Sequence, residues 1–260
     1  PLRGCKMNVL IPVILPLATA LAIMVLGRIA SPNVRDGFHT FMAAVTFYFV
    51  CTLVPEVMDG GRPEFFVAEI FPGAELSFKV EPLGLLFGLV ASGLWIPTSV
   101  YAFGYMRGHH EGNQTRFFTC FAMAIGFAIG VAFSSNLLTL FCFYEALTFS
   151  TFPLVTHHQD AAAKRSGRIY IGILVGTSVC LLLTGVISVW FFTGRMDFAE
   201  GGILEGHVDG VMVPILLALF AFGTGKAALF PFHKWLPNAM VAPTPVSALL
   251  HAVAVVKAGV

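Results

Sequence analysis

Charged side chains are scarce in this sequence. Asp, Glu, Lys and Arg make up 11% of its 260 residues, whereas apolar residues make up 57%. A typical soluble domain carries about 25% charged residues, so the composition excludes an ordinary water-soluble domain. The formal net charge is only +1, and phosphate binding needs a concentrated basic surface. We therefore expect no nucleic acid as a partner.

Motifs for redox or hydrolytic chemistry are missing as well. The five cysteines form no CxxC pair, and the sequence has no glycine-rich phosphate loop, haem motif or nucleophile elbow. The pairs His109-His110 and His157-His158 have no acidic or cysteine partners at ligand spacing, which favours solvated loop residues over metal ligands. We predict no metal, no cofactor and no redox site within this chain.

Long apolar stretches are what the sequence has in abundance. A hydrocarbon core about 30 Å thick needs about 20 mostly apolar residues per helical crossing. The prediction is an all-α, polytopic transmembrane helical bundle of about eight spans, the first of which is too long for the apolar core of a cleaved signal. The predicted spans are 8–30, 38–58, 83–106, 117–134, 136–156, 169–192, 211–232 and 243–260.

Three connections differ in character. Segment 59–82 is rich in Gly and Pro and is predicted to be exposed, with room for a short surface element. Segment 157–168 ends in basic residues, and segment 193–210 is acidic. Basic residues resist crossing to the outer face, so the odd-numbered loops are predicted to be cytoplasmic and the N-terminus to face outward. The basic residues counted for the odd loops are Arg28, Arg35, Arg107, Arg116, Lys164, Arg165, Arg168 and Lys234.

Four ionisable residues fall inside predicted spans: Glu145, Lys226, His251 and Lys257. An ionisable group near mid-membrane costs about 2.5–3.5 kcal/mol even on lenient insertion scales, so it normally faces the bundle interior. An approach of Glu145 to Lys226 would favour the protonated amine, and their separation would favour proton release. The alternative is a static ion pair that only fixes helix packing.

The surroundings of Lys226 favour a broken helix. Gly223 and Gly225 leave room beside the lysine, and Pro231 cannot donate a backbone hydrogen bond. Unwound backbone at membrane depth is tolerated only against protein or a wet cavity, and it recurs at transport sites. The seventh span is therefore predicted to be broken near Pro231, with an ordinary proline kink as the alternative.

His251 and Lys257 are predicted to act as onward relay groups. They lie six residues apart, about 9 Å along one helix, so transfer between them would need water. Histidine titrates near neutral pH, which suits a relay. A hydrogen-bonded structural role is the alternative for His251.

Two stretches resemble a known family. The sequences GKAALFPFHKWLPNAMVAPTPVSALLHAVAVVKAGV and SNLLTLFCFYEALTFSTFPLV are similar to the proton-conducting antiporter-like membrane subunits of NADH:quinone oxidoreductase and of Mrp-type sodium/proton antiporters. The resemblance implies that Glu145 pairs with Lys226, and that Lys257 with His251 passes protons onward. It also implies a bacterial plasma membrane or a mitochondrial-type inner membrane.

The resemblance also implies a domain organisation. The family fold has about fourteen helices with two inverted five-helix repeats. Residues 1–116 would then hold spans one to three, and residues 117–260 the first repeat, spans four to eight. Because the sequence stops inside the eighth predicted span, we expect a fragment or a truncated product.

The functional expectation is a proton-translocating subunit of a multisubunit complex. Its partners would be other membrane subunits, the lipid bilayer and protons, with sodium as a further partner if the subunit exchanges cations. Either coupling to NADH:quinone electron transfer or exchange of protons for monovalent cations is compatible with the residues. A non-conducting membrane anchor for other subunits is the alternative.

The predicted orientation can be tested by cysteine labelling with a membrane-impermeant probe added from outside. We expect a cysteine at Gly201 to react and one at Ser166 to stay unlabelled, because the odd loops should be cytoplasmic. Labelling at Ser166 without labelling at Gly201 would reverse the orientation.

Overall fold

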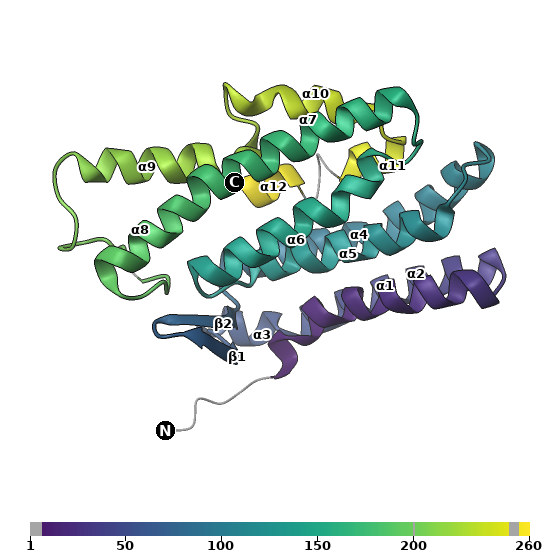
Figure 1. Cartoon of the computed structure of the whole chain (residues 1–260). Coiled ribbons are helices and arrows are strands. Elements are labelled where there is room, and N and C mark those ends of the chain that lie inside the picture. The colour runs from purple at the N-terminus through teal and green to yellow at the C-terminus, as the bar shows by residue number, and fades with distance from the viewer. Residues whose placement is uncertain (1–6, 200, 250–254) are drawn as a thin grey trace.

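The computed structural model describes residues 7–199, 201–249 and 255–260 as a layered bundle of long helices with one small β-hairpin (Figure 1). Six helices within these ranges are long and apolar enough to cross a membrane. They are α1 (Ile11–Ile29), α2 (Pro32–Thr52) extended by α3 (Val54–Met58), α4 (Pro82–Gly108), α5 (Gln114–Ala132), α6 (Leu137–Val155), and α7 (Ala161–Thr177) continued by the π-helical turn η2 (Ser178–Leu182) and α8 (Leu183–Thr193).

The first six predicted spans each correspond to one of these helices, whereas the two remaining predicted spans do not form single long helices within the described residues. The seventh region forms α9 (Met212–Gly223), whose 12 residues reach only about 18 Å. Short turns follow: η3 (Gly225–Ala227), η4 (Phe232–Lys234), α10 (Trp235–Asn238) and η5 (Ala239–Val241). The eighth region is described only as α11 (Thr244–Ala248) and α12 (Val255–Gly259), and His251 lies outside the described residues.

The break in the seventh region is wider than predicted. The helix stops at Gly223, eight residues before Pro231, and Ala228 adopts a left-handed conformation with φ of 56°. Proline therefore does not start the break. Thr224 leaves the helical conformation first, where α9 meets the irregular backbone of η2.

Segment 59–82 contains a β-hairpin, so the all-α prediction is wrong here. Strand β1 (Glu64–Phe71) pairs antiparallel with β2 (Ala74–Lys79), with Glu64 opposite Lys79. Gly73 supplies the positive φ of 80° that the turn requires. Strand β1 is mostly exposed, as expected for this segment, whereas β2 packs against the start of α6, where the Ser77 amide donates to Thr139 Oγ1 at 3.1 Å.

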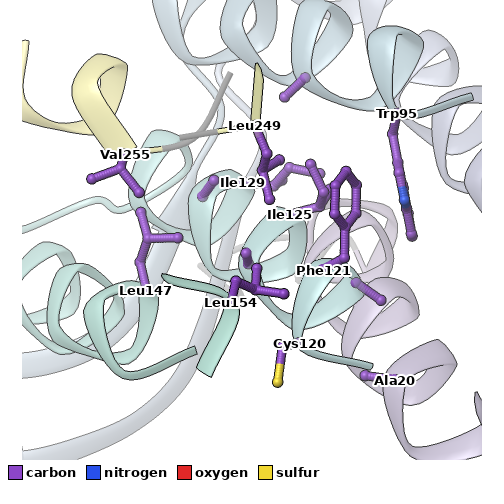
Figure 2. Packing of buried hydrophobic residues seen from close by; sticks show 14 of the residues in the cluster. Ala20, Trp95, Cys120, Phe121, Ile125, Ile129, Leu147, Leu154, Leu249 and Val255 are labelled. Carbon is purple, nitrogen blue, oxygen red and sulfur yellow. The ribbon is translucent and has the colours of Figure 1, made fainter. Parts of the chain in front are cut away.

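Helix α5 is the central element of the bundle. In its most apolar stretch, α5 has 67% of its residues buried. The corresponding stretches of the other five long spans have 28–44% of their residues buried. Figure 2 shows Phe121, Ile125 and Ile129 of α5 packed with Trp95 of α4 and with Leu147 of α6. Close packing of this kind holds helices together in lipid, where no hydrophobic force drives them against each other.

A buried ion network joins α2, α4 and α5 at one end of the bundle. Arg35 Nε donates to Asp36 Oδ1 at 2.8 Å, and Arg107 forms a second ion pair with Asp36. Arg35 also donates to Gln114 at 3.0 Å. Arg35 is thus a buried, paired residue of α2 and not the loop residue that the sequence suggested.

The loops divide between two faces of the bundle. The hairpin contacts segments 133–136 and 194–198 at one end, called the hairpin face, where the Leu137 amide donates to Met196 O at 3.0 Å. Segments 30–31, 109–113 and 156–160 lie at the other end, called the loop face (Figure 1). Which face is cytoplasmic stays a prediction. Ser166 is buried in α7, so its exposed neighbour Arg165 is the better labelling position.

Candidate functional site

Lys226 lies in the break that follows α9, and its side chain is completely buried. The regular hydrogen bonding of α9 ends at Gly223, and the backbone that follows is irregular. A backbone without a helical ladder must find other partners inside a membrane. The residues that supply those partners define the site.

Side chains from other elements satisfy the freed backbone groups. The Lys226 amide donates to Tyr144 Oη of α6 at 3.1 Å, and Trp235 Nε1 of α10 donates to Gly225 O at 2.9 Å. Within the break itself, the Ala227 amide donates to Thr224 O at 2.9 Å. The unwound segment is therefore held by α6 and α10 rather than left to lipid.

The amine of Lys226 also contacts Tyr144. Its Nζ donates to the backbone oxygen of Tyr144 and lies 3.1 Å from the centroid of the tyrosine ring. The carbonyl dipole and the negative ring face both stabilise a positive charge. Thr148 Oγ1 donates to the same carbonyl at 3.3 Å, so a hydroxyl group adjoins the amine.

Glu145 is the next residue of α6 and is half-buried. Its Oε1 atom is buried and makes no hydrogen bond with any described residue. Among the described residues, no carboxylate forms an ion pair with Lys226 within 4.0 Å. The structure thus places Lys226 against Tyr144, the residue that precedes Glu145, without a direct ion pair to Glu145.

Glycines allow the break to pack against the sixth span. A methyl group added at Gly225 would collide with the Thr177 side chain, and one added at Gly223 would collide with the backbone of Leu182 in η2. Single π-helical turns of this kind are frequent at functional sites. The irregular backbone of η2 thus packs on the end of α9, and the end of α7 packs on η3, which carries Lys226.

Lys257 is exposed on α12. It lines a cavity of about 330 Å³ together with Tyr144 and Thr224. The backbone of α12 packs on the break, because a methyl group at Gly259 would collide with the Ala227 amide. Lys257 and Tyr144, the residue that Lys226 contacts, thus line the same space.

Several residues of the site were missed from the sequence. Tyr144 had only its position beside Glu145 as a signal. Trp235 is fully buried, and its ring packs edge-to-face on Tyr170 with the ring centroids 5.6 Å apart. His233 has a buried Nδ1 atom that makes no hydrogen bond with any described residue.

The expectation that the histidine pairs are solvated is wrong for His157. Its side chain is 2% exposed and lies 3.7 Å from the Glu111 carboxylate. Glu111 belongs to the loop between α4 and α5, far from His157 in sequence. The spacing of residues along the chain therefore could not reveal this contact. In the described part of the chain, no group of three or more His, Cys, Asp or Glu residues is placed to hold a metal ion.

Six apolar helices, a seventh that stops part-way across, and a buried lysine at the stop define a multi-pass integral membrane protein of the antiporter-like type. Residues 134–260 match the family model described as NADH:quinone oxidoreductase/Mrp antiporter, transmembrane. The chain belongs to this family.

Curated relatives cover most of this chain. It is 33% identical to a putative antiporter protein of Staphylococcus haemolyticus over 82% of its length and 27% of the relative. It is 32% identical to the A1 component of a Na⁺/H⁺ antiporter of Staphylococcus aureus over 96% of its length and 31% of the relative. It is 33% identical to a probable K⁺/H⁺ antiporter component of Rhizobium meliloti over 86% of its length and 22% of the relative. The chain thus spans less than a third of these relatives.

A solved structure shares the fold. A chain of the membrane-bound sulfane sulfur reductase, an archaeal respiratory membrane complex, superposes with a TM-score of 0.84 at 23% sequence identity. The match covers 96% of this chain and 51% of the archaeal one.

The contact between the break and the end of α7 can be tested with Gly225→Ala. We expect this variant to lose about 1–3 kcal/mol of stability, because the added methyl group collides with Thr177. Thermal unfolding of the purified protein in detergent measures the loss. Gly172→Ala is the matched control, since a methyl group there meets open space on α7. The double variant Gly225→Ala/Thr177→Ala should recover part of the lost stability, because the Thr177 side chain that collides is shortened. An unchanged melting temperature for Gly225→Ala would contradict this packing.

Proposed function

We propose that this chain is part of a membrane subunit of a multisubunit cation/proton antiporter of the Mrp type, in which Lys226 carries the transported proton. The observation that supports this most directly is the completely buried Lys226 in the helix break, against the Tyr144 carbonyl and beside Glu145. An amine in such a place is costly, so a role that uses its ionisation is favoured over a packing role.

The proposed mechanism depends on which group neighbours the amine. In the described geometry the Tyr144 carbonyl and ring hold Nζ, while an oxygen of Glu145 is unsatisfied. A change of side-chain conformation that brings this oxygen to about 4 Å would add about 4 kcal/mol of attraction at an effective dielectric of 20. Approach and withdrawal of Glu145 would thus load and unload Lys226.

The cavity shared by Tyr144, Thr224 and Lys257 supports an onward route. The Lys226 amine contacts Tyr144, and Tyr144 lines this space of about 330 Å³, in which water could carry a proton towards the amine of Lys257. His251 is proposed as a further relay group on sequence grounds alone. The proton would then leave the break towards α12.

Exchange of protons for monovalent cations is favoured over coupling to electron transfer. The relatives at 32–33% identity are named as sodium or potassium antiporter components, whereas the respiratory complex shares the fold at 23% identity. Coupling to respiration remains the second candidate. The bacterial relatives further support a bacterial plasma membrane, with other membrane proteins of the complex as partners.

Lys226→Ala tests the proposal in the assembled complex reconstituted into vesicles. We expect loss of most cation-dependent proton exchange with assembly preserved, because no other buried amine replaces Lys226 within the described residues. Lys226→Arg should also be inactive, because arginine keeps the charge but does not release its proton. Lys234→Ala is the control, since Lys234 is exposed eight residues further on.

The outcomes separate the candidates. Full exchange in Lys226→Ala would support a non-conducting anchor and refute the proposal. Rescue by Lys226→Arg would show that only a fixed positive charge is needed. Proton movement that ignores sodium and potassium but follows electron transfer would favour the respiratory candidate.

A further inference from the structure

A second group of ionisable side chains lies on the loop face, next to the C-terminal end of α6. Glu111 Oε2 is 3.7 Å from His157 Nε2 and 3.5 Å from His158 Nδ1. Glu111 comes from the loop between α4 and α5, and the two histidines come from the loop between α6 and α7. These three residues, called the loop-face cluster, have no part in the site around Lys226.

The cluster forms a graded series from solvent to interior. The side chain of His158 is 37% exposed, that of Glu111 is 17% exposed, and that of His157 is 2% exposed. His158 can therefore exchange protons with water directly. His157 is buried, so its proton exchange with bulk water has to pass through a neighbouring group such as Glu111. Such a series has the order that stepwise proton uptake requires.

The surroundings of His157 keep its imidazole neutral. Burial lowers the pKa of His157, and the charge of Arg116 lowers it further. Arg116 donates to the carbonyl of His157 at 2.9 Å, while the negative charge of Glu111 acts in the opposite direction and the neighbouring His158 acts with Arg116. A neutral imidazole can accept a proton on one nitrogen and give one up from the other.

The second ring nitrogen of His157 is Nδ1. This atom is buried and makes no hydrogen bond with any described residue. Buried polar atoms are normally satisfied, so an unpaired one indicates a missing water or an exchange role. The outer nitrogen, Nε2, lies on the side of Glu111.

Buried hydroxyl groups lie along α6 between His157 and Lys226. Thr151 Oγ1 and Tyr170 Oη are 2.7 Å apart, and both residues are fully buried. One turn earlier, Thr148 donates to the Tyr144 carbonyl that also accepts from Lys226. His157 follows the end of α6, six residues after Thr151, and water must bridge the gap between the two side chains.

We propose that the loop-face cluster of Glu111, His157 and His158 is the proton uptake site that serves Lys226 through the buried hydroxyls of α6 and α7. This rests on the proposed function of Lys226. A proton taken from water by His158 or Glu111 moves to His157 Nε2, and the imidazolium gives up its Nδ1 proton inward. Only N–H and O–H bonds form and break, and rotation of the neutral ring resets the site.

The experiment compares Glu111→Gln and His157→Gln with wild type in the reconstituted complex, with the pH varied on each side of the vesicle in turn. Glutamine keeps polar contacts but does not bind a proton at these pH values. We expect exchange to slow several-fold as the pH rises on the side of the loop face, and to approach the wild-type rate at low pH. His158→Gln should show the same trend more weakly, because water can still reach Glu111.

Two controls keep the result interpretable. His109→Gln removes an exposed histidine of the same face that stacks on Tyr105 outside the cluster, and it should leave the pH profile unchanged. Complex assembly, measured for every variant, separates misfolding from slow uptake, and His158→Gln tests the proposal without disturbing a buried position.

The uptake proposal is overturned if Glu111→Gln and His158→Gln keep the wild-type pH profile, or if their rates fall equally at every pH. This failure is distinguishable from failure of the proposed function. In the first case Lys226→Ala is inactive while the cluster variants behave like wild type, whereas in the second case Lys226→Ala itself remains active.

Discussion

The contact between the Lys226 amine and the backbone carbonyl of Tyr144 is the interaction on which the site depends. A lone amine in the membrane interior is costly, so Lys226 needs polar partners there. The break places the lysine against α6, where a carbonyl, an aromatic ring and the neighbouring Glu145 surround it. In the proposed mechanism, this geometry solvates the amine without a fixed ion pair, which allows Lys226 to bind and release a proton.

The rest of the bundle makes that contact possible. Helix α5 supplies a buried axis for α1, α4 and α6, and the paired charges of Arg35, Asp36 and Arg107 fix its end at the loop face. Against this rigid part, the irregular backbone of η2 and η3 is held by glycines and by the hydrogen bond from Trp235 to Gly225. Unwound backbone is tolerated at this depth because protein, and not lipid, covers it.

The sequence alone predicted the apolar helices and the residues Glu145 and Lys226, because the membrane imposes a simple rule on length and charge. It misplaced the break, since the stop at Gly223 depends on packing against η2, a contact between distant segments. It missed the pairing in β1 and β2, because short apolar pieces in a polar loop carry little signal. His157 was misjudged for the same reason as Tyr144: its partners come from other parts of the chain.

The central claim is that Lys226 binds and releases a proton under the influence of Glu145. The most direct measurement is nitrogen NMR of lysine side chains in the assembled complex in bilayers, with the Lys226 signal assigned by its loss in Lys226→Arg. The account predicts that this signal titrates within the pH range of exchange and that its midpoint moves in Glu145→Gln. A signal that stays constant over that range, or a midpoint that ignores Glu145→Gln, would contradict it.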